Sequence, residues 1–470
     1  MAENIGTETN PLRVAIIGSG PSGFYAADHL LKQKDMTVEV DMFERLPTPF
    51  GLVRGGVAPD HQKIKSVTKL YDRIAGKENF RYYGNVTFGE DITRSDLQTY
   101  YHAVVYAVGS SSDKKLGIPG EDLPGSAPAT EFVGWYNAHP DYRELEFDLS
   151  VEAVAVIGIG NVAMDVTRIL ARSQEELDKT DIATYAQEAL ANSNIKRIYV
   201  LGRRGPAQAA FTNPEIKELG EMQDADIIVT QRDVEMDEPS RAYLTSDQVD
   251  TKDVKNVEIL KEFADRTPAG KPKQIIMKFL TSPTEIVGTD RVEGIKVVRN
   301  ELYVTEDGRI RPRATEETEI LPVGMVFRSV GYRGEPLPDV PFYDKWGIIP
   351  NADGRVLTEF GGDEVVTGDY VVGWIKRGPS GVIGTNKPDS VESMKMLLED
   401  VAEGNTWSPA SPDRAAMEAM LDAKGVGYIS YSDWQIIDEL EVSRGEAEGR
   451  PRLKFTEVSA MLEALSEQKA

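Results

Sequence analysis

The stretch RVAIIGSGPSGFYAADHLLK, residues 13–32, decides the fold of this chain. Its first residues are apolar and β-branched, as in a buried parallel strand, and the residues that follow have the period of a helix. Gly18, Gly20 and Gly23 form a G-x-G-x-x-G pattern between the two, with Ser22 inside the turn. Such a turn brings the backbone close to a pyrophosphate at a helix N-terminus. The stretch therefore predicts a dinucleotide-binding α/β unit.

A second strand, VEVDMFE at 38–44, follows this helix and ends in Glu44, about 20 residues after Gly23. An acidic residue at that point accepts hydrogen bonds from the hydroxyl groups of a ribose. The first motif therefore predicts a nucleotide with a free ribose diol, such as FAD.

The same layout returns in VAVIGIGNVAMDVTRILA, residues 154–171, with Gly158, Gly160 and Ala163 in the glycine positions. The strand after its helix, IKRIYVLGRR at 195–204, ends in Arg203 and Arg204 instead of an acid. Guanidinium groups bind a 2′-phosphate through paired hydrogen bonds, whereas a carboxylate would repel it. This motif predicts NADP(H), although a solvated basic turn is the alternative. Together the two motifs predict a flavoprotein that passes hydride between nicotinamide and flavin.

The remaining patterns are weaker. AVVYAVGSSS at 103–112 predicts another buried strand. From residue 273 to 331 the period changes to two, and we expect antiparallel strands at QIIMKFL, VEGIKVVRNELYV and GMVFRSVGY, with a turn at Asp307–Gly308. Near the end of the chain we expect three helices. The first has Val391, Met394, Leu398 and Val401 on a single face, and the second runs from Pro412 to Gly425. The third begins with a capping box at Ser432 and Gln435.

Composition excludes several classes of protein. The chain has 470 residues, a formal net charge of −24, four histidines and no cysteine. Without cysteine it carries no disulfide, no Cys-bound metal or iron–sulfur cluster and no Cys-x-x-Cys redox pair. The acidic balance argues against nucleic-acid binding, which needs clustered cations. With no long apolar run and no signal sequence, we expect a cytoplasmic protein without a membrane span or a metal site.

Five stretches together resemble one family, the adrenodoxin-reductase-like ferredoxin–NADP reductases. They are IGSGPSGFYAADHLL at 17–31, PFGLVRGGVAPDHQKIK at 49–65, VIGIGNVAMDVTRIL at 156–170, GRRGPAQAAFT at 202–212 with Glu215, and GWIKRGPSGVIGTNK at 373–387. The resemblance implies two Rossmann-like domains, with an NADP domain (108–330) inserted into an FAD domain made of residues 1–107 and 331–470, the latter with C-terminal helices.

The resemblance also implies a set of cofactor contacts. FAD is expected at Ser22, Glu44, Leu52, Val86, Trp374, Gly381, Val382 and Ile383. NADP is expected at Ile159, Gly160, Asn161, Val162, Arg203, Arg204 and Glu215, with Gly381 near the nicotinamide.

His61 in APDH is the candidate for handling protons. A lone histidine is more often structural, but the resemblance places this one near the flavin, where with Glu215 it would relay protons or orient the nicotinamide. Hydride transfer itself requires positioning and no acid or base. We therefore expect His61 and Glu215 to support the reaction, together with Asp165.

The resemblance names a ferredoxin as the partner, and the cluster must lie on that separate protein. Lys65, Lys69 and Arg73 have the spacing of one helix face and could meet an acidic partner, although a solvated face explains them as well. Two other functions remain open. One is an oxidoreductase like the small subunit of glutamate synthase, whose cysteine-rich cluster domain is absent here. The other is a non-catalytic NADP-binding flavoprotein. Disulfide reductases are excluded because their catalytic cysteines are missing.

Overall fold

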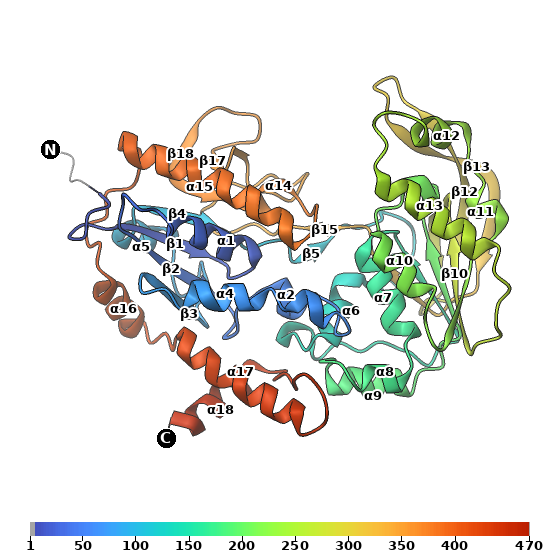
Figure 1. Cartoon of the computed structure of the whole chain (residues 1–470), viewed down its shortest axis with the longest axis horizontal. Coiled ribbons are helices and arrows are strands. Elements are labelled where there is room, and N and C mark those ends of the chain that lie inside the picture. The colour runs from blue at the N-terminus through green and yellow to red at the C-terminus, as the bar shows by residue number, and fades with distance from the viewer. Residues whose placement is uncertain (1–4, 470) are drawn as a thin grey trace.

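The computed structural model describes residues 5–469 and folds them into two α/β domains that lie side by side (Figure 1). The first domain is built from both ends of the chain, and the second from the middle. This confirms the predicted fold class, in which one Rossmann-like domain is inserted into another. The boundaries at residues 107 and 330 stay a prediction. The chain crosses between the domains twice, and the two crossing segments contain β5 (Ser112–Asp113) and β15 (Tyr332–Arg333), which pair with each other.

The first domain is organised around a seven-stranded sheet. Its parallel centre consists of three strands that are mostly apolar and almost fully buried, as expected for a sheet covered on both faces. In spatial order the strands are β16 (Asn351–Ala352), β17 (Arg355–Leu357), β18 (Val365–Val371), β4 (Ala103–Tyr106), β1 (Leu12–Ile17), β2 (Val38–Glu44) and β3 (Phe80–Gly84).

Helices cover this sheet and continue into a C-terminal extension. The helix of the first glycine motif packs against α15, so the two ends of the chain share one core (Figure 1). The helices are α1 (Pro21–Leu30), α2 (Leu52–Gly55), α3 (Gln62–Lys65), α4 (Thr68–Ala75), α5 (Arg94–Tyr100), α14 (Trp374–Arg377), α15 (Asn386–Glu403), α16 (Arg414–Ala423), α17 (Tyr431–Glu446) and α18 (Val458–Lys469).

The second domain has a six-stranded parallel sheet. Its strands in spatial order are β6 (Ser126–Pro128), β14 (Met325–Arg328), β7 (Ala153–Ile157), β8 (Arg197–Leu201), β10 (Lys273–Lys278) and β9 (Ala225–Ile228). The expectation of antiparallel strands at β10 and β14 is therefore wrong, since both pair in parallel with their neighbours. A period of two shows which side chains face a core, but it does not show the direction of the partner strand.

The antiparallel expectation is confirmed for VEGIKVVRNELYV, which forms β12 (Gly294–Val304) and pairs with β11 (Thr281–Val287) and β13 (Ile310–Leu321), two strands that were not predicted. The turn between β12 and β13 contains Gly308, whose φ of 79° lies in the left-handed region that glycine tolerates. The helices of the domain are α6 (Ala129–Tyr136), α7 (Asn161–Ala171), α8 (Gln174–Leu177), α9 (Thr184–Ala191), α10 (Asn213–Leu219), α11 (Gln231–Val234), α12 (Glu238–Leu244) and α13 (Thr251–Ala264).

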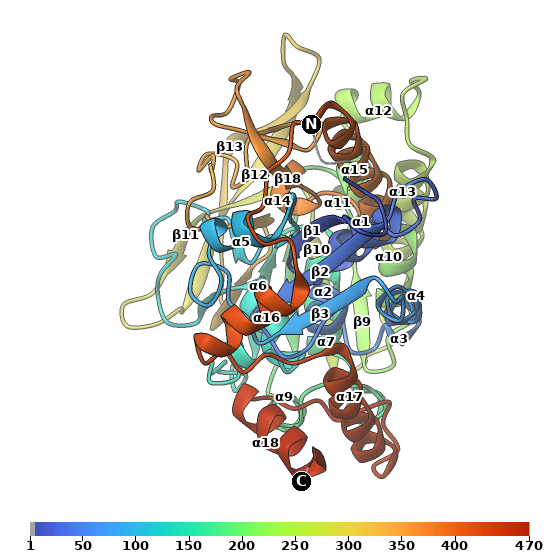
Figure 2. The same cartoon turned by 90° about the vertical axis from the view of Figure 1, so that its left-hand side faces the viewer.

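The last two helices form a separate arm below the first domain (Figures 1 and 2). The capping box of α17 is made by Ser430 and Asp433, two residues before the predicted pair of Ser432 and Gln435. Between α17 and α18 the chain reaches the second domain, where Lys454 approaches Asp181 at 3.1 Å. Within residues 5–469, no helix has the length and apolar character needed to cross a membrane.

Candidate functional site

A cavity of about 1080 Å³ runs between the two domains. This volume lies at the upper end of ordinary ligand pockets, which span about 300–1000 Å³. Most of the predicted site residues line it. They are Gly18, Gly20, Ser22, Glu44, Leu52, His61, Val86, Asn161, Val162, Asp165, Glu215, Trp374, Gly381, Val382 and Ile383.

The first glycine motif shapes one end of this cavity. Gly18 has a φ of 100°, and a Cβ there would lie 2.7 Å from the carbonyl oxygen of Ala107. A Cβ on Gly23 would lie 2.5 Å from the carbonyl oxygen of Gly18, so this glycine packs inside the turn instead of lining the cavity. At Gly20 a Cβ would meet nothing within 4 Å, because this residue borders the open space. The motif therefore forms a cradle that fits the pyrophosphate of a dinucleotide.

Glu44 lies beside this cradle at the end of β2. Its Oε2 accepts hydrogen bonds from the backbone N–H of Ser19 at 3.1 Å and from the Ser19 hydroxyl at 2.7 Å, and its Oε1 accepts one from the N–H of Leu46 at 3.2 Å. These bonds fix the carboxylate at the cavity wall. A carboxylate has about four acceptor positions, so it can still accept a ribose hydroxyl.

The cavity is also lined by Trp374 of α14 and by the loop that follows this helix. The Trp374 Nε1 donates to the carbonyl oxygen of Ser380 at 3.1 Å, and its ring lies 5.2 Å from that of Tyr332. Ser110 lies in the same cavity, and its buried hydroxyl has no hydrogen-bond partner in the part of the chain that the structure describes. A buried polar group without a partner fits a site whose ligand supplies the missing hydrogen bond.

The second glycine motif lies at the N-terminus of α7. Gly158 has a φ of 136° and packs on the carbonyl oxygen of Ser329, which a Cβ would approach to 2.1 Å. The Asn161 Oδ1 accepts a hydrogen bond from the N–H of Thr212 at 2.9 Å, which holds the loop after β8 against the motif. Gly158, Ile159 and Gly160 lie outside the cavity lining, whereas Asn161 and Val162 belong to it.

Arg203 and Arg204 follow β8, also outside the cavity lining. Within residues 5–469 neither forms an ion pair with a carboxylate. The Asn300 side chain fixes the loop by donating to the Arg203 carbonyl oxygen at 2.8 Å. The pKa of Arg204 is lowered by partial burial and by the nearby charges of Arg203 and Arg311. Repelling cations without counter-charges are suited to binding a phosphate.

His61 lies where the two domains meet. Its Nδ1 lies 3.9 Å from Asp165 Oδ1 and 3.9 Å from Glu215 Oε1, so the structure brings the three predicted residues together. Burial raises the pKa of Asp165 to about 6, against the opposing charge of Arg168.

The shortest side-chain contact of His61 is with Glu218, a residue that the sequence did not point to. Its Nε2 lies 3.1 Å from Glu218 Oε2. Burial opposes the charged imidazole, but the hydrogen bond to Glu218 and the charges of Asp60 and Glu215 raise the pKa of His61 above its ordinary value. The same bond lowers the pKa of Glu218. Ligand atoms of His61, Glu215 and Glu218 lie within 4.8 Å of one another, but the guanidinium of Arg168 already binds Glu215 at 2.8 Å and opposes a cation here.

Lys65 does not belong to an exposed basic face. Its Nζ donates to both oxygens of the buried Asp181, at 2.7 and 2.8 Å, so this part of the docking hypothesis is wrong. The helix also breaks between α3 and α4, and of the three predicted cations Lys69 and Arg73, both on α4, are exposed.

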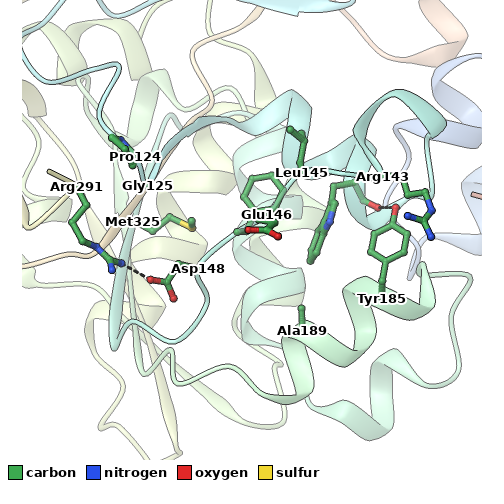
Figure 3. A pocket seen from close by; sticks show the side chains of 12 residues that line it. Pro124, Gly125, Arg143, Leu145, Glu146, Asp148, Tyr185, Ala189, Arg291 and Met325 are labelled. Atoms are coloured by element: carbon green, nitrogen blue, oxygen red, sulfur yellow. Dashed lines mark hydrogen bonds and ion pairs between the residues drawn. The ribbon is translucent and has the colours of Figure 1, made fainter.

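A second cavity, of about 750 Å³, lies on the second domain beside α6 and α9 (Figure 3). Its two arginines already have partners, since Arg143 pairs with Glu457 at 2.9 Å and Arg291 pairs with Asp148. Neither glycine motif reaches it. The chemistry of the chain is therefore assigned to the cavity between the domains.

Comparison with known proteins gives consistent matches. Residues 12–198 match the family model described as pyridine nucleotide-disulphide oxidoreductase. NADPH-ferredoxin reductase FprA of Mycobacterium tuberculosis is 45% identical over 462 residues, which cover 96% of this chain and 98% of the relative. The mitochondrial NADPH:adrenodoxin oxidoreductase of Salvelinus fontinalis is 40% identical over 470 residues, which cover 97% of this chain and 92% of the relative.

A solved structure, Mycobacterium tuberculosis FprA in complex with NADPH, superposes with a TM-score of 0.90. The two chains are 44% identical, and the match covers 97% of this chain and 100% of the other. The similarity therefore extends over both domains and the C-terminal arm.

Proposed function

Because this chain belongs to the family of NADPH–ferredoxin reductases, we propose that it transfers electrons from NADPH through bound FAD to a separate ferredoxin. FAD and NADP(H) are its cofactors. When bound, FAD supplies the redox chemistry, since it accepts a hydride and passes electrons on singly. The residues of the chain bind, orient and shield the two nucleotides.

One observation carries this proposal, which is that the first glycine motif and the N-terminus of α7, which follows the second motif, line a single cavity at the domain junction. We assign the cradle at Gly20 to the pyrophosphate of FAD and Glu44 to its ribose. We assign Arg203 and Arg204 to the 2′-phosphate of NADP(H). Gly381 would lie beside the nicotinamide, where holding the two rings close would lower the barrier to hydride transfer.

The side chains at the junction orient the nicotinamide and manage protons. His61 lines the cavity, and its Nε2 lies at hydrogen-bond distance, 3.1 Å, from Glu218 Oε2, which restricts rotation of the ring. Asp165, whose pKa is raised toward neutrality, can hold a proton near the same place. We assign these groups a supporting role, since hydride transfer needs no proton donor.

The partner is an acidic one-electron carrier with its own iron–sulfur cluster, because this chain has no cysteine to bind one. A protein with a net charge of −24 meets an acidic partner through a local basic surface. Lys69 and Arg73 on α4 are exposed cations and remain candidates for that surface.

The test is an anaerobic titration with NADPH. The purified protein is expected to carry about one non-covalently bound FAD, whose absorbance bleaches with NADPH much faster than with NADH. Absence of flavin, or of bleaching, would contradict the proposal. A protein that binds both nucleotides without bleaching would be the non-catalytic alternative.

A further inference from the structure

Arg168 on α7 is a fully buried cation that the proposed chemistry does not yet use. Its guanidinium donates to Asp60 at 2.6 and 3.2 Å, to Asp165 at 2.6 Å and to Glu215 at 2.8 Å. Moving a charge out of water costs several kcal/mol, which is recovered only through good partners. Arg168 therefore depends on these three carboxylates, and they depend on it.

These partners come from both domains. Asp60 belongs to the loop before α3 in the first domain, whereas Asp165 lies on α7 and Glu215 on α10 in the second. Asp60 directly precedes His61, and Glu215 lies one helical turn before Glu218. Arg168 consequently binds a neighbour of His61 and a neighbour of Glu218, and its Nε lies 3.6 Å from Glu218 Oε2.

Arg168 also contacts the imidazole directly. Its Nη2 lies 3.4 Å from the Nδ1 of His61, while the Nε2 of His61 lies 3.1 Å from Glu218. A guanidinium only donates, so this contact favours a neutral imidazole in which Nδ1 accepts and the ring proton lies on Nε2. The carboxylates of Asp165 and Glu215, each 3.9 Å from Nδ1, favour the other tautomer, so the charge of Arg168 decides between the two.

We propose that Arg168 is a positioning residue that bridges the two domains and holds His61 in its Nε2-protonated tautomer against Glu218. The proposal rests on the proposed function in one respect, since it assumes that His61 serves hydride transfer. The geometry of His61 itself can be measured independently of that reaction.

The electrostatic surroundings of His61 define the expected pH response. The groups that face this site are Asp60 from the loop before α3, Asp165, Arg168 and Arg172 from α7, Glu215 and Glu218 from α10, and the hydroxyl groups of Tyr136 on α6 and Tyr332 on β15. The charge of Arg168 lowers the pKa of His61 against the raising effect of the carboxylates. Replacing this arginine by a neutral residue should therefore raise the pKa of His61 further.

Nuclear magnetic resonance of selectively ¹⁵N-labelled histidines measures the tautomer and the pKa of His61 directly in the FAD-loaded protein. The chain has four histidines. Burial lowers the pKa values of His102 and His139 to about 4 and also lowers that of His29, so His61 is the only one whose pKa is raised. His102 serves as an internal reference for the tautomer, because its Nδ1 accepts a hydrogen bond from the Arg13 N–H at 3.0 Å.

Arg168→Met and Arg168→Lys are compared with the matched variant Arg172→Met. Arg172 binds the same Asp60 at 2.6 Å but makes no contact with His61 or Glu218. In Arg168→Met we expect the preference of His61 for the Nε2–H tautomer to be lost and its pKa to rise, because the charge of Arg168 lowers it in the parent protein. Flavin reduction by NADPH should slow by about tenfold or more, with the NADPH Kd nearly unchanged. Arg172→Met should keep the tautomer and should change the His61 pKa and the rate much less than Arg168→Met does.

Arg168→Lys keeps the charge but loses the planar fork, so the rate should fall while the His61 pKa stays close to that of the parent protein. If Arg168→Met fails to fold, the His61 tautomer in Arg168→Lys tests the positioning role instead. An unchanged His61 tautomer in a folded Arg168 variant, or equal changes in Arg172→Met, would overturn the proposal and leave Arg168 as a structural brace. A changed tautomer with an unchanged rate would uphold the positioning and refute the role of His61 in the reaction.

Discussion

Replacing Arg204 by alanine tests the predicted 2′-phosphate site. The side chain is partly buried and, among residues 5–469, has no carboxylate partner, so its removal leaves no acid unpaired. The variant should therefore keep the fold and lose only binding to the nucleotide. As a control we choose Arg313→Ala, because Arg313 is an exposed arginine that pairs with Glu301 at 2.6 Å.

The size of the effect follows from the bond that is lost. A hydrogen bond between charged groups contributes about 1.5–3 kcal/mol. At about 1.4 kcal/mol per factor of ten, NADPH binding should weaken by about 10- to 100-fold. The phosphate lies far from the hydride, so the loss should appear in KM with kcat nearly unchanged.

The assay is steady-state reduction of ferricyanide, with kcat/KM measured for both NADPH and NADH. The ratio of the two should fall by about 10- to 100-fold in Arg204→Ala, while the NADH value and the Arg313→Ala control stay near those of the parent protein. If the ratio does not change, Arg204 is a solvated basic turn and the assignment of the 2′-phosphate site is wrong.

Three further results are expected. Gly20→Ala should keep its melting temperature without FAD but bind FAD at least about tenfold more weakly, because the added methyl group enters the cradle. FAD fluorescence measures the binding, and FAD binding as tight as in the parent protein would argue against the cradle. Asp181→Asn should lower the free energy of unfolding by about 3–5 kcal/mol at pH 7. Burial opposes the charged carboxylate, but two lysines lower the pKa of Asp181. The carboxylate therefore contributes to the free energy of unfolding above pH ~4, and this contribution is lost as the pH falls further. Denaturant unfolding should thus show a smaller difference between variant and parent protein at pH 3 than at pH 7. Reversing the charges of Lys69 and Arg73 should slow reduction of ferredoxin and weaken its salt dependence but spare ferricyanide, whereas equal losses would place docking elsewhere.

The features that the sequence predicted well are local ones. Gly18 and Gly158 have φ values of 100° and 136°, which the turn from strand to helix requires and glycine tolerates, so their position in the motif was informative by itself. The direction of β10 and β14 was mispredicted because each strand pairs with strands far away in the chain. Strand periodicity carries no information about such partners.

The candidate site shows the same limit. Lys65 was misplaced because its partner Asp181 lies 116 residues away, and because the helix breaks before Lys69. Glu218 could have been found, since residues three apart lie on one helix face and Glu215 was already a candidate. Arg168 was inside a quoted motif, but only the folded structure brings the carboxylates of two domains around it.

The measurement that tests the central claim most directly counts ferredoxin molecules reduced for each NADPH oxidised, under argon and with catalytic amounts of the FAD-loaded protein. The account predicts two, because one hydride carries two electrons and each ferredoxin accepts one. NADPH oxidation without reduced ferredoxin, or ferredoxin reduction that does not need the bound FAD, would contradict it.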